Sequence, residues 1–167
     1  MFALQNGDPA PEVDLVDARG NRWRLSSHHG KMVILHFCRG EYCPTTRGEF
    51  SHWDCFSHLF SKNNCEVALI VRGGRQEHAK FVEDFRIRPP LLIDEDGAVG
   101  EAYGIYGVHD TDMGRNDYKN YTAPAVYLID AEGNISCFWL LSGPRGRPSP
   151  ECLLGILAYA RHNAWKY

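Results

Sequence analysis

The residues with the clearest chemical potential lie in the segment HFCRGEYCPTTRGEF, at positions 36–50. Cys43 stands directly before Pro44, where an apolar run typical of a buried strand changes to a helical pattern. The first N–H groups of a helix have no intrahelical partner, and the helix dipole places about half a positive charge there. A thiolate at a helix start is therefore stabilised, and thiol pKa values there fall from about 8.5 to ~3.5–7.5. Cys43 is the candidate nucleophile of this chain.

The residues next to Cys43 fit that chemistry. Pro44 suits the first position of a helix, because its missing N–H would be unused there and its φ angle is preset. Arg39 and Arg47 flank the cysteine, and either guanidinium can stabilise a thiolate or donate to a bound oxygen. The alternative is an inert, half-buried cysteine at a helix start. The order strand, Arg-Gly, Cys-Pro, helix favours a reactive cysteine.

The other groups considered for chemistry include threonine hydroxyls and five further cysteines. Thr45 and Thr46 place hydroxyl groups one turn into the predicted helix, and Tyr42 is interpreted as a residue that lines the site. No Cys-x-x-Cys pair and no Cys/His cluster with zinc spacing occurs, so we expect no metal and no cofactor. His36, His52 and His58 are interpreted as structural. The other cysteines, which we expect to be reduced and mostly buried, are Cys38, Cys55, Cys65, Cys137 and Cys152.

The composition is that of an ordinary globular protein. The chain has 167 residues, of which 44% are hydrophobic and 23% charged, and we expect residues 1–167 to form a single domain. A net charge of -3 predicts no nucleic-acid partner and no anionic membrane surface. No apolar run approaches the ~20 residues of a membrane span, and the N-terminus lacks signal-peptide features. These observations predict a cytoplasmic protein.

Strand and helix signals alternate along the first two thirds of the chain. PEVDLVD and RWRL, on either side of ARGN, predict an N-terminal β-hairpin. The near-continuous apolar runs at 31–37 and 65–72 predict buried central strands. Apolar residues at helical spacing predict helices at 44–60 and 76–85. This alternation is typical of parallel βαβ units, in which chemistry lies beyond the carboxyl ends of the strands. Cys43 occupies such a position.

The sequence of the second part of the chain predicts a different arrangement of strands and helices. PPLLID, at 89–94, reads as a short strand, and a helical turn follows it. Segment 106–122 is polar, rich in tyrosine and without clear periodicity, and we interpret it as a loop that covers a site. Segment 125–141 predicts an antiparallel hairpin, which would make the sheet mixed. A final helix at 149–162 has Ser149 as its N-cap. We therefore expect an α/β fold with a mixed central sheet flanked by helices.

Four segments, in this order, resemble the peroxiredoxin-like redoxins of the alkyl hydroperoxide reductase/thiol-specific antioxidant (AhpC/TSA) family. They are GDPAPEVDLVDARGNRWRLSSHHGKMVILHF, RGEYCPTTRGEF, LLIDEDGAVGEAYGI and APAVYLIDAEGNI, and the resemblance spans about residues 7–141. This family belongs to the thioredoxin-fold superfamily. The resemblance therefore implies a thioredoxin-like fold and a redox-active cysteine at Cys43.

The site also departs from the patterns it resembles. Thioredoxin-type oxidoreductases have Cys-x-x-Cys, and Thr46 stands at the second position here, so their usual intramolecular disulfide cannot form. Peroxiredoxins have a threonine three residues before the reactive cysteine, where this chain has Gly40. They have an arginine at the start of the penultimate strand, where Pro124 stands, and Arg39 is our candidate to replace that guanidinium. Pro124 matches the cis-proline of thioredoxins, so we expect a cis Ala123–Pro124 bond beside Cys43.

The resemblance implies a thiol-dependent oxidoreductase, and three functions are compatible with these residues. The favoured one is a peroxidase that reduces hydroperoxides through Cys43, with Arg39 and Thr46 as catalytic partners. The alternatives are a monothiol disulfide reductase or isomerase acting on a disulfide substrate, and a non-enzymatic binding module. The predicted substrate pocket consists of Gly40, Tyr42, Pro44, Thr45, Arg47 and Pro124.

The partners follow from the single reactive cysteine. An external thiol reductant is expected, such as thioredoxin, glutaredoxin or glutathione, because most of the other cysteines are predicted to lie away from Cys43. Cys152 and Cys38 are the candidates if an internal cysteine resolves the oxidised thiol. Assembly into a homodimer is a further alternative that these residues leave open.

Overall fold

The computed structural model describes residues 4–40, 43–105, 107–108, 121–122, 124–140 and 147–163. At its centre is a seven-stranded sheet with the order β2-β1-β5-β4-β3-β8-β9. Its strands are β1 (Asp14–Asp17), β2 (Arg22–Arg24), β3 (Met32–Cys38), β4 (Cys65–Arg72), β5 (Leu91–Asp94), β8 (Ala125–Ile129) and β9 (Ile135–Leu140). The helices are the 3₁₀ helix η1 (Leu25–His28), α1 (Pro44–Lys62), α2 (Arg75–Phe85), α3 (Ala98–Ala102) and α4 (Pro150–Asn163).

The sheet is mixed, as the sequence predicts. β3, β4 and β5 run parallel, whereas β1 pairs antiparallel with β5, and β8 pairs antiparallel with β3. The hairpin β1–β2 confirms the predicted N-terminal hairpin, and β8–β9 confirms the terminal one. Helix α1 connects β3 to β4, and α2 connects β4 to β5. Both helices therefore begin at the carboxyl edge of the parallel strands, which is the edge that carries Cys43.

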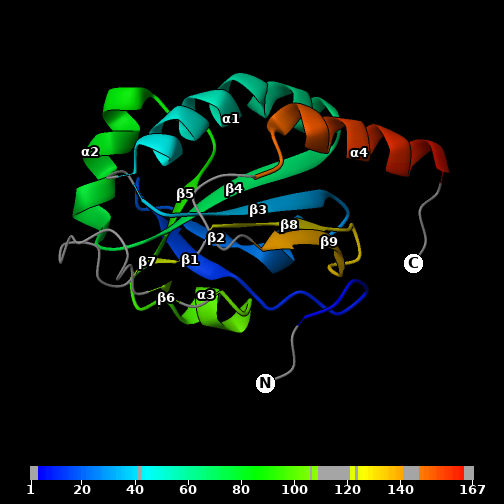
Figure 1. Ribbon diagram of the computed structural model, residues 1–167, viewed down its shortest axis with the longest axis horizontal. Helices are drawn as coiled ribbons and strands as arrows, with labels where there is room; N and C mark the ends of the chain where they lie inside the picture. The colour runs from blue at the N-terminus through cyan, green and yellow to red at the C-terminus, as the bar shows by residue number, and fades with distance from the viewer. Residues whose placement is uncertain are drawn as a thin grey trace.

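Two apolar layers enclose the sheet. Figure 1 shows α1 and α4 side by side over one face and α3 on the other. Strand β3 supplies both layers by alternation, with Ile34 and Cys38 facing the helices α1, α2 and α4, and with Leu35 and Phe37 facing α3. Trp53 of α1 is almost fully buried against the first face. Helix α1 is thus fixed by a continuous core, which sets the position of its first turn.

Segment 106–122 is only partly described. The structure places two-residue strands in it, β6 (Gly107–Val108) and β7 (Tyr121–Thr122), which pair antiparallel. The loop prediction for 106–122 was therefore wrong at these two points. Residues 109–120 lie outside the described residues, as do Tyr42 and Ala123, so the predicted pocket role of Tyr42 and the predicted cis bond before Pro124 do too. None of the helices described is long and apolar enough to cross a membrane.

Candidate active site

The turn between β3 and α1 depends on Gly40. Its φ angle is +114°, a conformation that side chains with a Cβ atom rarely adopt. The Cys43 N–H donates to the carbonyl of Gly40 over 3.2 Å, which closes the turn. A β-branched residue such as threonine at position 40 would be strained in this backbone. The departure at Gly40 therefore has a local structural cause.

Cys43 is the N-cap of α1, and the backbone of its first turn is arranged around it. Its φ and ψ angles, -84° and 116°, are extended, and Pro44 occupies the first helical position. The Arg47 N–H donates to the Cys43 carbonyl over 3.1 Å, which starts the helix. The N–H groups of Thr45 and Thr46 are left to interact with the Cys43 sulfur. Sequence and structure agree on this helix start.

These contacts decide the acidity of the thiol. Cys43 is 5% exposed, and burial by itself raises its pKa. The backbone N–H and the hydroxyl of Thr46 oppose that effect, followed by the Thr45 N–H. The charge of Arg39 adds to them. Together they hold the pKa of Cys43 below its ordinary value, so the thiolate is the favoured form at lower pH than for a free cysteine.

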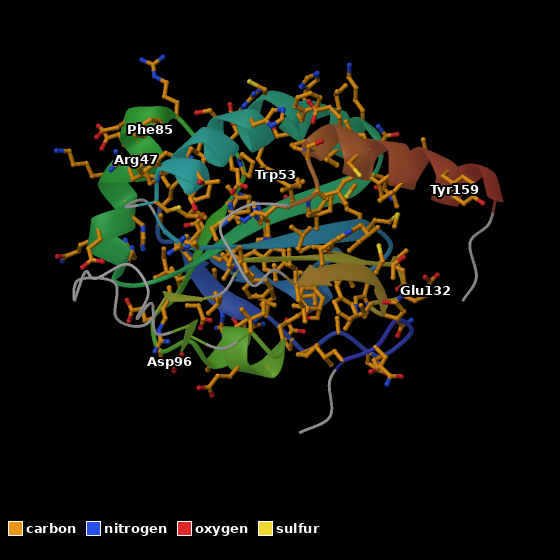
Figure 2. All side chains as sticks on the ribbon, in the orientation of Figure 1. Arg47, Trp53, Phe85, Asp96, Glu132 and Tyr159 are labelled. Carbon is orange, nitrogen blue, oxygen red and sulfur yellow. The ribbon has the colours of Figure 1, made fainter. Side chains whose placement is uncertain are left out.

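The predicted neighbours fall into two groups. Arg39 and Thr46 are buried beside the thiol, Arg39 at the end of β3 and Thr46 in the first turn of α1. Pro44, Thr45 and Arg47 are exposed at the same helix start, and Figure 2 shows Arg47 at that end of α1. The buried pair acts on the sulfur directly. The exposed group forms the rim of the site, and only the backbone of Thr45 contributes to the thiol.

Pro124 lies at the same edge of the sheet. It is buried and directly precedes β8, whose Ala125 pairs with Phe37 of β3. One further step in this antiparallel register brings Pro124 opposite Cys38, at the carboxyl end of β3. This register brings Pro124 to the end of β3, and its packing against Cys43 stays a prediction.

A buried polar cluster beneath α1 was not identified from the sequence. It consists of His36 and Cys38 from β3, Glu49 from α1, and Arg147 from the segment before α4. The Arg147 side chain is 3% exposed and its Nη1 donates to the Glu49 carboxylate, which is 21% exposed. His36 Nε2 lies 3.9 Å from the same carboxylate. The signal that was available is Glu49, a charged residue on the sheet-facing side of an otherwise apolar helix face.

The environment of this cluster suppresses ionisation of its other members. Burial, with the Arg147 charge nearby, lowers the pKa of His36 to about 3, so its ring is neutral. His36 lies in the core, but both of its ring nitrogens are buried without a hydrogen-bond partner among the described residues, so it is not a core histidine with satisfied hydrogen bonds. Burial and the Glu49 charge raise the pKa of Cys38 well above its ordinary value. Cys38 is therefore a poor nucleophile next to Cys43.

A cysteine at a helix start in this fold defines a class of proteins, the thiol-dependent oxidoreductases of the thioredoxin superfamily. Residues 6–137 match the model of the AhpC/TSA family, and the chain belongs to that family. It is a peroxiredoxin-like redoxin, as the sequence resemblance implies.

Similar proteins agree with this assignment. Peroxiredoxin Bcp of Bacillus subtilis is 23% identical over 140 residues, which cover 83% of this chain and 86% of that protein. The thiol-disulfide oxidoreductase ResA of Geobacillus kaustophilus is 28% identical over 134 residues, which cover 80% of this chain and 68% of ResA. Among solved structures, PrxQ of Xylella fastidiosa superposes with a TM-score of 0.82 at 18% identity, covering 96% of this chain and 99% of PrxQ. The last likeness confirms the thioredoxin-like fold.

The Thr46 hydroxyl provides a first prediction. Its oxygen is buried and has no hydrogen-bonded oxygen or nitrogen partner among the described residues, so its proton is available to the sulfur once Cys43 ionises. Thr46→Val keeps the shape and removes this donor. We expect the pKa of Cys43 to rise and its reaction with hydrogen peroxide at neutral pH to slow by about tenfold, the usual scale for a hydrogen bond to a charged group. Stopped-flow fluorescence over a pH series measures both quantities.

Thr45→Val is the matched control for this experiment. Thr45 is exposed, and it contributes to Cys43 through its backbone N–H, which valine retains. We expect wild-type kinetics from it. Equal effects of the two substitutions would contradict a specific role of the Thr46 hydroxyl.

Proposed function

We propose that this protein is a hydroperoxide reductase in which Cys43 is the single peroxide-reactive thiol, with Arg39 and Thr46 as catalytic partners. The observation that carries the proposal is the set of donors around the Cys43 sulfur: the N–H groups of Thr45 and Thr46, the Thr46 hydroxyl and the Arg39 charge. They favour the thiolate, and they lie where a developing alkoxide would need stabilisation.

The proposed reaction has two stages. The Cys43 thiolate attacks one peroxide oxygen, the O–O bond breaks, and the leaving alkoxide takes up a proton and departs as an alcohol or as water. Sulfur loses two electrons and becomes a sulfenic acid. An external thiol then displaces water to form a mixed disulfide, and a second thiol releases an external disulfide and restores Cys43. The Cys43 N–H is bound to the Gly40 carbonyl, so the helix-start N–H groups and Arg39 remain to stabilise the alkoxide.

A second candidate function is a monothiol disulfide reductase. The similarity to ResA and the position of Pro124 at the end of β8 favour it. In that case the Cys43 thiolate would attack a substrate disulfide, and an external thiol would resolve the mixed disulfide. Hydrogen peroxide separates the two functions, because only the peroxidase converts it to water with formation of a Cys43 sulfenate.

We expect an external thiol to reduce the oxidised Cys43, because the cysteines of the neighbouring strands are poorly placed to do so. Cys38 is buried and its Sγ donates to the His36 carbonyl over 3.3 Å, and Cys65 starts β4 at the opposite edge of the sheet. Cys55 and Cys152 are exposed on α1 and α4. After one equivalent of hydrogen peroxide, dimedone should trap a sulfenate on Cys43, and glutathione or thioredoxin should remove it.

Peptide mapping without reductant is the deciding measurement. A sulfenate on Cys43 with no internal disulfide supports the peroxidase with external resolution. A rapid disulfide between Cys43 and Cys38 or Cys152 would contradict the external step, and Cys38→Ala and Cys152→Ser would then identify the partner. Loss of peroxide without any modification of Cys43 would contradict the proposed function itself.

A further inference from the structure

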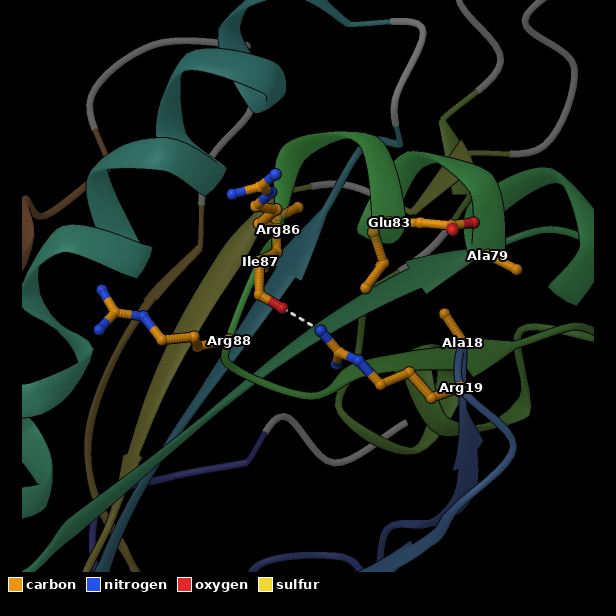
Figure 3. Close-up of a pocket in the computed structure, with 8 residues that line it drawn as sticks. Ala18, Arg19, Ala79, Glu83, Arg86, Ile87 and Arg88 are labelled. Carbon is orange, nitrogen blue, oxygen red and sulfur yellow. Dashed lines mark hydrogen bonds between the residues drawn. The ribbon is translucent and has the colours of Figure 1, made fainter.

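A pocket of about 510 Å³ lies beside α2 and the amino end of β5, and none of the residues that line it belongs to the site at Cys43. The Ala18 N–H donates to the Leu91 carbonyl over 2.8 Å, which places the pocket beside the amino end of β5. Leu69 of β4 pairs with both Leu91 and His36, so the amino end of β5 is level with His36, and β4 separates the pocket from β3. The lining residues are Ala18 and Arg19 after β1, Ala79, Val82 and Glu83 of α2, and Arg86, Ile87 and Arg88 before β5 (Figure 3).

The lining combines an apolar floor with a cationic rim. Ala18, Val82 and Ile87 are buried and form the floor. Three arginines stand around it with one acid, Glu83. This excess of positive charge is local to the pocket, because the whole chain has a net charge of -3. A pocket that is apolar with a few placed polar groups is the usual form of a small-molecule site, and its volume falls in the common range.

The three arginines are not equivalent. Arg88 is neutralised by Asp54, whose two carboxylate oxygens lie 3.0 Å from its Nε and Nη2. Arg19 reaches across the pocket and donates a single N–H to the Ile87 carbonyl, as Figure 3 shows. Among the described residues no acid pairs with Arg19 or Arg86. Two guanidinium groups at the pocket therefore have donors that no carboxylate of the described protein satisfies.

Arg86 occupies a position that its backbone does not favour. It caps α2 in the left-handed conformation, with φ 51° and ψ 40°, where glycine is the usual residue. A side chain with a Cβ atom is strained there. The arginine at this position is thus not explained by backbone conformation, and its guanidinium is the feature that glycine would lack.

We propose that this pocket binds a small organic anion. Its carboxylate or phosphate group would contact Arg19 and Arg86, and its apolar body would lie against Ala18, Val82 and Ile87. Such a ligand would connect the turn after β1, the end of α2 and the segment before β5. It would stabilise the native state by mass action and would not compete with a peroxide at Cys43.

Titrations followed by ¹⁵N–¹H NMR test this proposal on the full chain. The probes are phenyl phosphate and benzoate, with inorganic phosphate and phenol as the charge-only and apolar-only controls. We expect saturable shifts at residues 18–20 and 86–88 with at least one aromatic anion, and about tenfold weaker binding of both controls, because each lacks one half of the contact. The tighter of the two aromatic anions identifies the preferred head group.

Two variants and one control assign the shifts to the arginines. Arg19→Gln and Arg86→Gly should each weaken binding by about tenfold, the scale of one charge-assisted contact. Arg86→Gly relieves the left-handed backbone, so its thermal unfolding temperature should not fall and loss of binding cannot be assigned to unfolding. Arg24→Gln, in β2, should bind as the wild type does. Absence of saturable shifts, wild-type affinity in either pocket variant, or equal binding of inorganic phosphate would overturn the proposal.

Discussion

Cys43→Ser is expected to abolish hydroperoxide turnover, with a loss of about 10³-fold or more, as for removal of other catalytic nucleophiles. The physical reason is that the donors around position 43 stabilise a thiolate, and a serine hydroxyl stays protonated in the same place. The measurement is the initial rate of hydrogen peroxide consumption with a thiol reductant in excess. The fold should be unchanged, because serine keeps the extended N-cap conformation and is itself a favoured N-cap residue.

Two exposed cysteines provide the controls for this loss. Cys55→Ser and Cys152→Ser remove thiols that are accessible to peroxide, and both should retain wild-type turnover. This comparison distinguishes the exposure of a thiol from its reactivity with peroxide, because Cys43 is far less exposed than either control cysteine. Residual turnover above about a tenth of wild type in Cys43→Ser would contradict the assignment, since a missing nucleophile costs orders of magnitude.

The buried ion pair beneath α1 is expected to have the largest effect on stability. Glu49→Gln leaves the guanidinium of Arg147, 3% exposed, without its carboxylate. An arginine cannot lose its charge, so we expect a loss of about 3–5 kcal/mol in the free energy of unfolding. Arg147→Met should cost less, about 2–3 kcal/mol, because Glu49 is partly exposed and can take up a proton. Urea denaturation of the purified variants measures both values.

The double variant decides whether these losses arise from one interaction. Removing both charges leaves no uncompensated ion, so Glu49→Gln combined with Arg147→Met should be more stable than Glu49→Gln alone. Additive losses would show that the two side chains act independently. In that case the ion pair would not be what holds α1 to the segment before α4.

The elements near Cys43 could be predicted because their signals are local. The apolar run of β3, the Cys-Pro pair and the helical spacing that follows are all read within about thirty residues. The N-cap role of Ser149 was predicted in the same local way, from a serine directly before a helical pattern. Its hydroxyl accepts a hydrogen bond from the Cys152 N–H over 3.3 Å, as an N-cap does. Signals that are local in the sequence thus predicted the candidate cysteine and the helix that begins at it.

The buried cluster and the pocket beside α2 could not be predicted in the same way. Glu49 and Arg147 are 98 residues apart, and only the packing of the segment before α4 against α1 brings them together. The pocket combines the turn after β1 with the end of α2, which meet because β1 pairs with β5. Gly40 was noted as a departure, but its reason, a φ angle of +114°, is visible only in the folded chain. Tertiary contacts determine all three.

The most direct test of the account is the pH dependence of alkylation at each cysteine, followed by mass spectrometry with iodoacetamide. The midpoint of each rate profile reports the thiol pKa, and unlike the absolute rate it does not depend on how exposed the sulfur is. Cys43 should have the lowest midpoint, below the ordinary value of a cysteine thiol. The midpoints of Cys38 and Cys137 should lie above that value. A Cys43 midpoint at or above the ordinary value would contradict the claim that this helix start activates a thiol.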